Sequence, residues 1–232
     1  MKAYQVIPSI LQRIVWLPVR LGFKLFCHLE VSGLENVDEE NNLIFASSHA
    51  SELDPILIAV SLPLLSRHLP LFFTGQEKKF YKGMGWKRLI YGGRFFKAWG
   101  AYPVYVGLKN YEQALRHHIA IIRGGNSVCI FPTGKRTADG EPAKARGGVA
   151  FLAHKTQVPV VPVFIHGARG IMPQDFFLQR RKVSVIFGRP IHANDLFANS
   201  KNIVLNDRIN DYEKAAAKIM KLVAPGSQRV LH

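Results

Sequence analysis

The sequence predicts an α/β fold, a single layered domain in which helices flank a central, largely parallel sheet. Two observations lead to this prediction. Short apolar segments that resemble buried strands alternate along the chain with segments whose apolar residues recur at helical spacing. The connections between them are short, as is typical of layered folds built from alternating strands and helices. The 232 residues, 48% of them hydrophobic, suffice for one sizeable core but not for two large domains.

The individual elements follow from the same patterns. Strands are predicted where short apolar runs occur, at residues 43–46, 71–75, 102–106, 127–131, 158–165 and 182–187, with a short edge strand within 31–37. Helices are predicted at residues 56–60, 111–123, 147–156 and 211–223. Gly124 and Gly125 end the second of these helices, because glycine readily adopts the conformations that close a helix.

The N-terminal segment, residues 4–29, is predicted to be an amphipathic helix or two shorter helices broken at a proline. At about 100° per residue, Arg13, Arg20 and Lys24 fall within an arc of roughly 40°. Apolar residues occupy most of the remaining circumference. Such a wide apolar face fits a helix that lies at a membrane interface, and the alternative is a helix packed on the protein's own core. The positive charge elsewhere in the chain favours the membrane.

The charge balance predicts an acidic partner. The chain has 31 Lys and Arg against 16 Asp and Glu, a formal net charge of +15. Such an excess suits an anionic membrane surface, nucleic acid, or acidic substrates and carriers. No uninterrupted apolar run approaches the length of about 18 residues that a spanning helix needs, and we expect neither a spanning helix nor a signal peptide. We divide the chain into an interfacial helical segment, 1–30, and an α/β domain, 31–232.

Residues 76–97 interleave basic and aromatic side chains. Such a segment could bind single-stranded nucleic acid by stacking, or it could lie at a membrane interface, where cations and aromatic rings both belong. Because no known nucleic-acid module is recognisable, we predict an anionic membrane surface as partner and no nucleic acid.

Cysteine and histidine spacings predict neither a disulfide nor a metal site. Cys27 and Cys129 lie far apart in apolar surroundings and are expected to be buried free thiols in a reducing compartment. Most histidines are scattered along the chain. His117 and His118 are adjacent on a predicted helix, where neighbouring side chains point apart.

A histidine at the end of a buried strand is the first candidate for a catalytic role. The apolar run at 43–46 stops at two serines, His49 follows, and Asp54 lies five positions further on. An aspartate so placed can accept the proton on one ring nitrogen, so that the other nitrogen can take a proton from a substrate hydroxyl. The alternative on spacing alone is an ordinary surface histidine beside a helix-capping side chain.

A loop with two adjacent cations follows a later predicted strand. Gly134 permits close backbone approach, Thr133 offers a hydroxyl, and Lys135 and Arg136 supply charge. Arginine grips a phosphate through a planar pair of donors, whereas lysine acts as a point charge. Arg146 could add to the same pocket, and because this loop and the histidine both follow strands, the two groups can converge. The alternative is a solvated basic turn.

These pieces occur in an order that resembles the glycerophospholipid acyltransferase family, whose bacterial type member is 1-acyl-sn-glycerol-3-phosphate acyltransferase. The resemblance runs from about residue 31 to residue 191. The family's blocks match the His-x4-Asp pair, Gly-x-x-Pro-Val at 100–104, Phe-Pro-x-Gly-x-Arg at 131–136, and Val-Pro-Val-Val-Pro-Val at 158–163.

The resemblance implies a membrane-surface O-acyltransferase without a cofactor. By it, His49 is the general base that deprotonates the hydroxyl of a lysophospholipid such as 1-acylglycerol-3-phosphate, and Asp54 orients it. The donor is a fatty acyl thioester, acyl-CoA or acyl carrier protein, and no covalent acyl-enzyme is needed. The phosphate-binding block corresponds to Gly134 and Arg136. The family also implies a peripheral or monotopic protein on the cytoplasmic face of a membrane.

Three positions depart from the family's pattern. Thr133 stands where the third block usually has Glu, Lys135 stands where Thr is usual, and Val106 replaces the Arg that commonly closes the second block. The family associates these positions with the acceptor's phosphate and glycerol. The departures therefore leave two alternatives open: an acceptor that is not the precursor of phosphatidate, and a non-catalytic, basic membrane- or lipid-binding protein.

Overall fold

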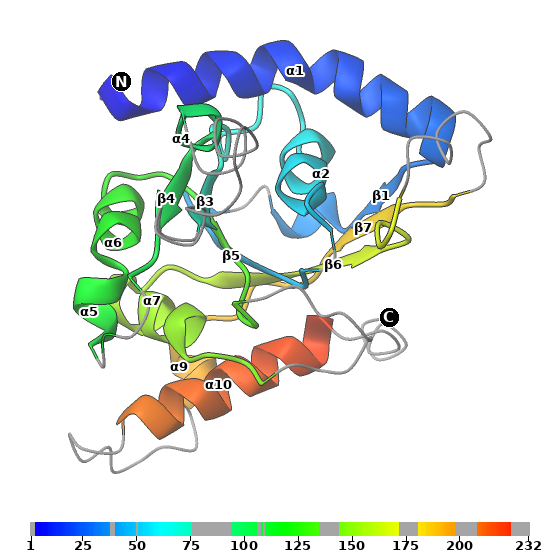
Figure 1. Ribbon diagram of the computed structural model, residues 1–232. Coiled ribbons are helices and arrows are strands. Elements are labelled where there is room, and N and C mark those ends of the chain that lie inside the picture. Colours follow the sequence, from blue (N-terminus) through cyan, green and yellow to red (C-terminus); the bar gives the residue numbers. More distant parts are fainter. Residues whose placement is uncertain are drawn as a thin grey trace.

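In the computed structural model, seven strands form one sheet with helices on both faces (Figure 1). The structure describes residues 3–37, 40–49, 51–75, 94–105, 108, 110–134, 144–171, 181–197 and 208–223. The strands are β1 (Glu30–Ser32), β2 (Ile44–Ser47), β3 (Phe72–Gly75), β4 (Ala101–Pro103), β5 (Val128–Ile130), β6 (Val160–His166) and β7 (Ser184–Phe187). Their order across the sheet is β1-β7-β6-β2-β5-β3-β4.

The sheet is largely parallel, as the sequence predicted. Only the pair of β6 and β7 is antiparallel among the described strands; all the other neighbours run parallel. The strand that precedes the histidine, β2, lies between β5 and β6, where Ile44 is opposite Val128 and Val160. Because β2 and β5 are parallel neighbours, the chain segments that follow them leave the sheet side by side at the same edge.

Helices cover the sheet in two layers. The described helices are α1 (Ala3–Cys27), α2 (Asp54–Ser61), α4 (Arg94–Trp99), α5 (Tyr111–Ala114), α6 (Arg116–Arg123), α7 (Gly148–Thr156), α9 (Ala193–Phe197) and α10 (Arg208–Val223), with a 3-10 turn η1 (Leu34–Asn36). In Figure 1, α1 and α2 lie on one side of the sheet, whereas α10 lies on the other side beside α7 and α9.

Each layer covers its own hydrophobic core, because alternate residues of a strand point to opposite faces of the sheet. Phe45 and Phe73 belong to the core beneath α1 and α2. Ile44 and Ala46, the neighbours of Phe45 on β2, belong to the core beneath α7 and α10. All four residues of β2 are buried, as expected for a central strand covered on both faces. Cys129 lies in the first of these cores as a free thiol.

The helix predicted at residues 111–123 is divided into α5 and α6 at Leu115, whose backbone leaves the helical region. The side chain of Asn110 caps α5 by accepting hydrogen bonds from the backbone N–H groups of Glu112 and Gln113. At the other end, α6 stops at Arg123 before the two glycines, as predicted, and Gly125 has a positive φ of 80°.

The N-terminal helix α1 is one continuous helix despite its two prolines, and it is bonded to the rest of the fold along its length. Near its start, the side chain of Gln5 donates to Asn126 at 2.8 Å. In the middle, the amide of the buried Gln12 donates to the carbonyl of Leu71 and accepts from the same residue's N–H, both at 2.8 Å. At its end, the backbone carbonyl of Cys27 accepts from Val183.

The arginines of α1 face the protein, which the sequence pattern did not indicate. Arg13 donates to the carbonyl of Leu69 at 3.1 Å, and Arg20 donates to the carbonyl of Val60 at 2.6 Å. The large apolar side chains of the opposite face are left exposed, among them Ile7, Ile10, Ile14, Leu17, Leu21 and Leu25, between 46% and 68% exposed. One face of α1 therefore packs on the fold, as the second alternative expected, and the other face is exposed; whether that face lies at a membrane interface stays a prediction.

Candidate active site

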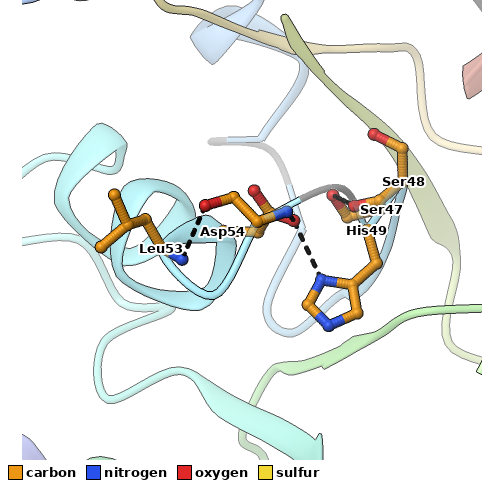
Figure 2. A network of polar contacts seen from close by, with 6 residues as sticks. Ser47, Ser48, His49, Leu53 and Asp54 are labelled. Carbon is orange, nitrogen blue, oxygen red and sulfur yellow. Dashed lines mark hydrogen bonds and ion pairs between the residues drawn. The ribbon is translucent and has the colours of Figure 1, made fainter. Parts of the chain in front are cut away.

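The predicted pair of His49 and Asp54 is formed in the structure. Nδ1 of His49 lies 2.9 Å from Oδ2 of Asp54 (Figure 2). His49 follows the end of β2, and Asp54 is the first residue of α2. The rigid ends of a strand and a helix thus hold the two side chains. Five residues of separation are enough for the chain to leave the strand, turn, and begin the helix.

The carboxylate is held by the turn that starts α2. Oδ2 of Asp54 also accepts a hydrogen bond from the backbone N–H of Ser51 at 2.8 Å, and the side chain of Ser51 accepts from the N–H of Leu53 at 3.2 Å. A negative charge in the first turn of a helix interacts favourably with the helix dipole. The side chain of Asp54 is 1% exposed, so water competes little for the carboxylate.

The pairing determines the role of each ring nitrogen of His49. An ionised carboxylate can only accept, so Nδ1 carries the proton in this contact. Nε2 is then the nitrogen that can take up a proton, and in Figure 2 it points away from Asp54. The side chain of His49 is 22% exposed, so the ring is reachable from solvent.

Phe131 fixes the plane of the histidine ring. Its ring is stacked on that of His49 with the centroids 4.3 Å apart and the planes 27° from parallel. Phe131 follows directly after β5, the parallel neighbour of β2, so the sheet brings the two rings together. From the sequence, Phe131 was expected only as the last residue of the strand at 127–131 and as part of a family block, with no role at the site. The available signal was its place at the end of a strand adjacent to the one before His49.

The structure brings two of the predicted binding residues together. Gly134 has a φ of 65°, in the left-handed region that favours glycine, and a Cβ added there would lie 3.4 Å from the side chain of Arg146. The backbone N–H of Arg146 donates to the carbonyl of Pro132. An exposed guanidinium therefore packs over the loop that Phe131 begins.

Of the other predicted binding residues, only Thr133 lies within the described part of the chain. Thr133 is buried, with 7% of its surface exposed. Lys135 and Arg136 lie outside the described residues, as do residues 76–93 of the basic, aromatic segment and Val106 of the second block. Their proposed contributions stay predictions.

Two other histidines, His68 and His118, are buried in the fold and have no access to substrate. His68 is 1% exposed; its Nε2 donates to the carbonyl of Val37 at 2.8 Å, and its Nδ1 lies 2.8 Å from the hydroxyl of Ser127. Burial lowers the pKa of His118 to about 4, so that this side chain is neutral at pH 7. Within the part of the chain that the structure describes, no three His, Cys, Asp or Glu side chains are grouped so that they could hold a metal ion.

Comparisons with known proteins identify the family of the chain. The family model described as Acyltransferase matches residues 28–166, which include the histidine–aspartate pair and the Gly134 loop. The chloroplastic 1-acyl-sn-glycerol-3-phosphate acyltransferase BAT2 of Brassica napus is 29% identical over 173 residues, 73% of this chain, and the chain spans only 46% of that protein's length. The 1-acyl-sn-glycerol-3-phosphate acyltransferase of Bacillus subtilis is 27% identical over 193 residues, covering 80% of this chain and 88% of that protein.

A solved structure has a similar fold. The 1-acyl-sn-glycerophosphate (LPA) acyltransferase PlsC from Thermotoga maritima superposes with a TM-score of 0.56 at 21% sequence identity. The match covers 91% of this chain and 80% of the Thermotoga chain. The agreement therefore extends beyond the matched family region and supports the α/β architecture for most of the molecule.

Proposed function

This chain belongs to the Acyltransferase family, and on that premise we propose that it moves a fatty acyl group from a thioester carrier to the hydroxyl of a lysophospholipid at a membrane surface. The observation that carries the proposal is the contact between Nδ1 of His49 and the buried carboxylate of Asp54 at 2.9 Å. It gives a reachable imidazole a fixed tautomer and a nearby negative charge, which a general base requires.

In the proposed reaction, Nε2 of His49 takes the proton of the acceptor hydroxyl as its oxygen attacks the thioester carbonyl carbon. The C–S bond then breaks, the acyl group remains on the acceptor oxygen, and the leaving thiolate receives the proton from the imidazolium. Asp54 stabilises the positive charge that His49 carries between the two transfers. The pair lacks an attached nucleophile, so a direct transfer without an acyl-enzyme suffices.

The acceptor we propose is 1-acylglycerol-3-phosphate. Arg146 supports this choice, because it is exposed and its side chain packs against Gly134, three residues after the Phe131 ring that stacks on His49. A guanidinium binds phosphate through charge-assisted hydrogen bonds. Thr133 is the weaker candidate for headgroup binding since it is buried, and Lys135 and Arg136 are proposed to add charge. The alternative acceptor is a lyso-lipid with another headgroup.

We propose that the exposed apolar face of α1 seats the protein on an anionic bilayer. By length and composition, α1 is also the one described helix that could cross a membrane. Its bonds to Asn126, Leu71 and Val183 favour an orientation in the plane of the interface, because a spanning orientation would draw the attached fold into the bilayer. The net charge of +15 would strengthen binding to anionic lipid.

The decisive experiment is an acyl-transfer assay on mixed vesicles. Purified protein is offered acyl-CoA or acyl carrier protein thioesters and a panel of lyso-lipids with and without a phosphate monoester, with His49→Ala run in parallel. We expect transfer to 1-acylglycerol-3-phosphate that is lost in the variant. Transfer only to other acceptors would mean that the protein is specific for a lyso-lipid with another headgroup. Vesicle binding without transfer to any acceptor would mean that the protein binds lipid and is not an enzyme.

A further inference from the structure

Helix α2 connects the catalytic pair to the proposed membrane helix. Its first residue is Asp54, which holds His49. Its last residue is Ser61, so the two ends are about 12 Å apart at a rise of about 1.5 Å per residue. A helix of this length transmits a displacement of one end to the other, because its backbone hydrogen bonds resist stretching and bending. Whatever holds the far end therefore affects the position of Asp54.

The far end of α2 is held by two side chains of α1. Nη1 of Arg20 donates to the carbonyls of Val60 and Ser61, at 2.6 and 3.1 Å. Nε1 of Trp16 donates to the carbonyl of Leu62 at 2.8 Å. The guanidinium of Arg20 also lies 5.0 Å from the centre of the Trp16 ring, at cation–π distance. Three consecutive carbonyls at the end of α2 are thus bound from a helix some 40 residues earlier.

These contacts supply what α2 lacks. The last carbonyls of any helix have no partner within the helix, and a cation near them interacts favourably with the helix dipole. The last turn of α2 contains no basic residue, so the cation comes from Arg20. Partial burial lowers the pKa of Arg20, but an arginine remains charged at neutral pH. The charge is therefore held against the helix end rather than in open solvent.

We infer that Arg20 and Trp16 are positioning residues that set the distance between Asp54 and His49 by holding the C-terminal end of α2. Since the opposite face of α1 is the proposed membrane face, the same helix links the bilayer to the catalytic pair. This inference rests on the proposed function. It concerns which residues place the carboxylate, and neither Arg20 nor Trp16 touches the reacting atoms.

The chain offers a matched control in Arg13. It lies on the same side of α1, seven positions earlier, and it also donates to a backbone carbonyl, that of Leu69. Leu69 is outside α2, so removal of Arg13 costs α1 the same charge without freeing the helix end. Differences between the two arginine variants therefore report on α2 and not on the charge of α1.

The test compares Arg20→Gln, Arg20→Lys, Trp16→Phe and Arg13→Gln in the full chain on vesicles. We expect Arg20→Gln to lower kcat about tenfold, because small misplacements of catalytic groups are costly, with KM for the lyso-lipid changed less than about twofold. Arg20→Lys should recover part of the loss, since lysine can still donate to one carbonyl. Trp16→Phe keeps the ring and loses only the N–H, so about a threefold fall in kcat is expected. Arg13→Gln should keep kcat.

A double variant separates positioning from general destabilisation. In the Asp54→Asn background, Arg20→Gln should lower kcat no further, because the carboxylate through which it acts is already absent. The NMR signal of the His49 Nδ1–H proton supplies a readout without turnover: it should move in Arg20→Gln and stay in place in Arg13→Gln. All the variants should pellet with vesicles as the wild type does.

Several results would overturn the inference. One is an equal loss of kcat in Arg20→Gln and Arg13→Gln. Another is a further tenfold loss of kcat when Arg20→Gln is added to Asp54→Asn. The third is an unchanged NMR signal of the His49 Nδ1–H proton in folded Arg20→Gln. If Arg20→Gln does not fold, Trp16→Phe tests the inference instead: an unmoved NMR signal of the His49 Nδ1–H proton in that variant would overturn it. An inactive wild type would reject the proposed function alone, because the NMR comparison still tests the positioning.

Discussion

His49 and His68 have similar contacts in different surroundings, and the difference bears on which of the two can act as a base. Each ring has a hydrogen-bonding partner at Nδ1 and an aromatic neighbour. Around His68 both nitrogens are occupied by Val37 and Ser127, and the residue is 1% exposed. Around His49 the Nδ1 partner is a carboxylate, and the ring is reachable. An imidazole becomes a useful base when one nitrogen is paired with a negative charge and the other is left for the substrate.

The largest expected difference concerns the reaction itself. His49→Ala should lower kcat by about 10²–10⁴-fold, since the proton acceptor is lost. Asp54→Asn should lower it by a similar factor, because an amide permits the wrong tautomer. Initial rates on vesicles check both. Unchanged melting temperatures would show that the site and not the fold is affected, and a variant with more than about a tenth of the wild-type kcat would contradict the assigned role.

The reverse result is expected for His68. His68→Phe should lower the free energy of unfolding by about 2–4 kcal/mol, because it leaves the buried carbonyl of Val37 and the hydroxyl of Ser127 without this partner. Urea unfolding monitored by circular dichroism measures the loss. The kcat of the folded fraction should match the wild type; a large fall in kcat would mean that the two histidines are not separate in function.

A third histidine extends the comparison to pH. The pKa of His118 is about 4 in the folded protein because the ring is buried, and about 6.5 when unfolded. The unfolded chain therefore binds the proton more readily between these values, and stability falls as pH decreases from about 6.5 toward 4, by up to about 3 kcal/mol. His118→Gln should remove this part of the pH dependence of urea unfolding, and an unchanged slope would contradict the assignment.

The smallest effects concern the aromatic neighbours. Phe131→Leu removes the stack on His49 and should lower kcat about threefold to tenfold by loosening the ring plane. Phe45 meets His68 edge-on at 5.8 Å, and Phe45→Leu should cost about 1–2 kcal/mol of stability with kcat kept. Parallel kinetics and unfolding of the two variants test this pairing. Equal effects of the two substitutions on kcat would contradict the prediction that only Phe131 influences the reaction.

Much of the fold could be predicted from the sequence because its signals are local. Apolar runs such as 43–46 and 158–165 mark the strands, and the helix stop before Gly124 follows from glycine's conformational freedom. The division of α5 from α6 at Leu115 was not predictable, since nothing in the periodicity of residues 111–123 marks it. A helical pattern gives the residues of a face but not small breaks in it.

The N-terminal helix also shows what sequence periodicity cannot predict, in this case the contacts of a whole helix face. Its periodicity correctly grouped Arg13 and Arg20 on one side, yet the expected neighbour was the membrane headgroup region. In the structure they bind carbonyls of Leu69 and Val60. A helical wheel states which residues share a face and cannot state what that face contacts, because the partner lies some 40 to 56 residues away in the chain.

The sequence by itself determined the pair of His49 and Asp54, because only four residues separate them and a strand end and a helix start bring them together locally. Only the tertiary structure decided that Phe131 stacks on His49, that Arg146 packs over Gly134, and that Arg20 holds the far end of α2. Each of these contacts depends on the order of strands in the sheet or on the docking of a whole helix. Such non-local arrangements follow from the packing of both cores and are not encoded in any short stretch of the chain.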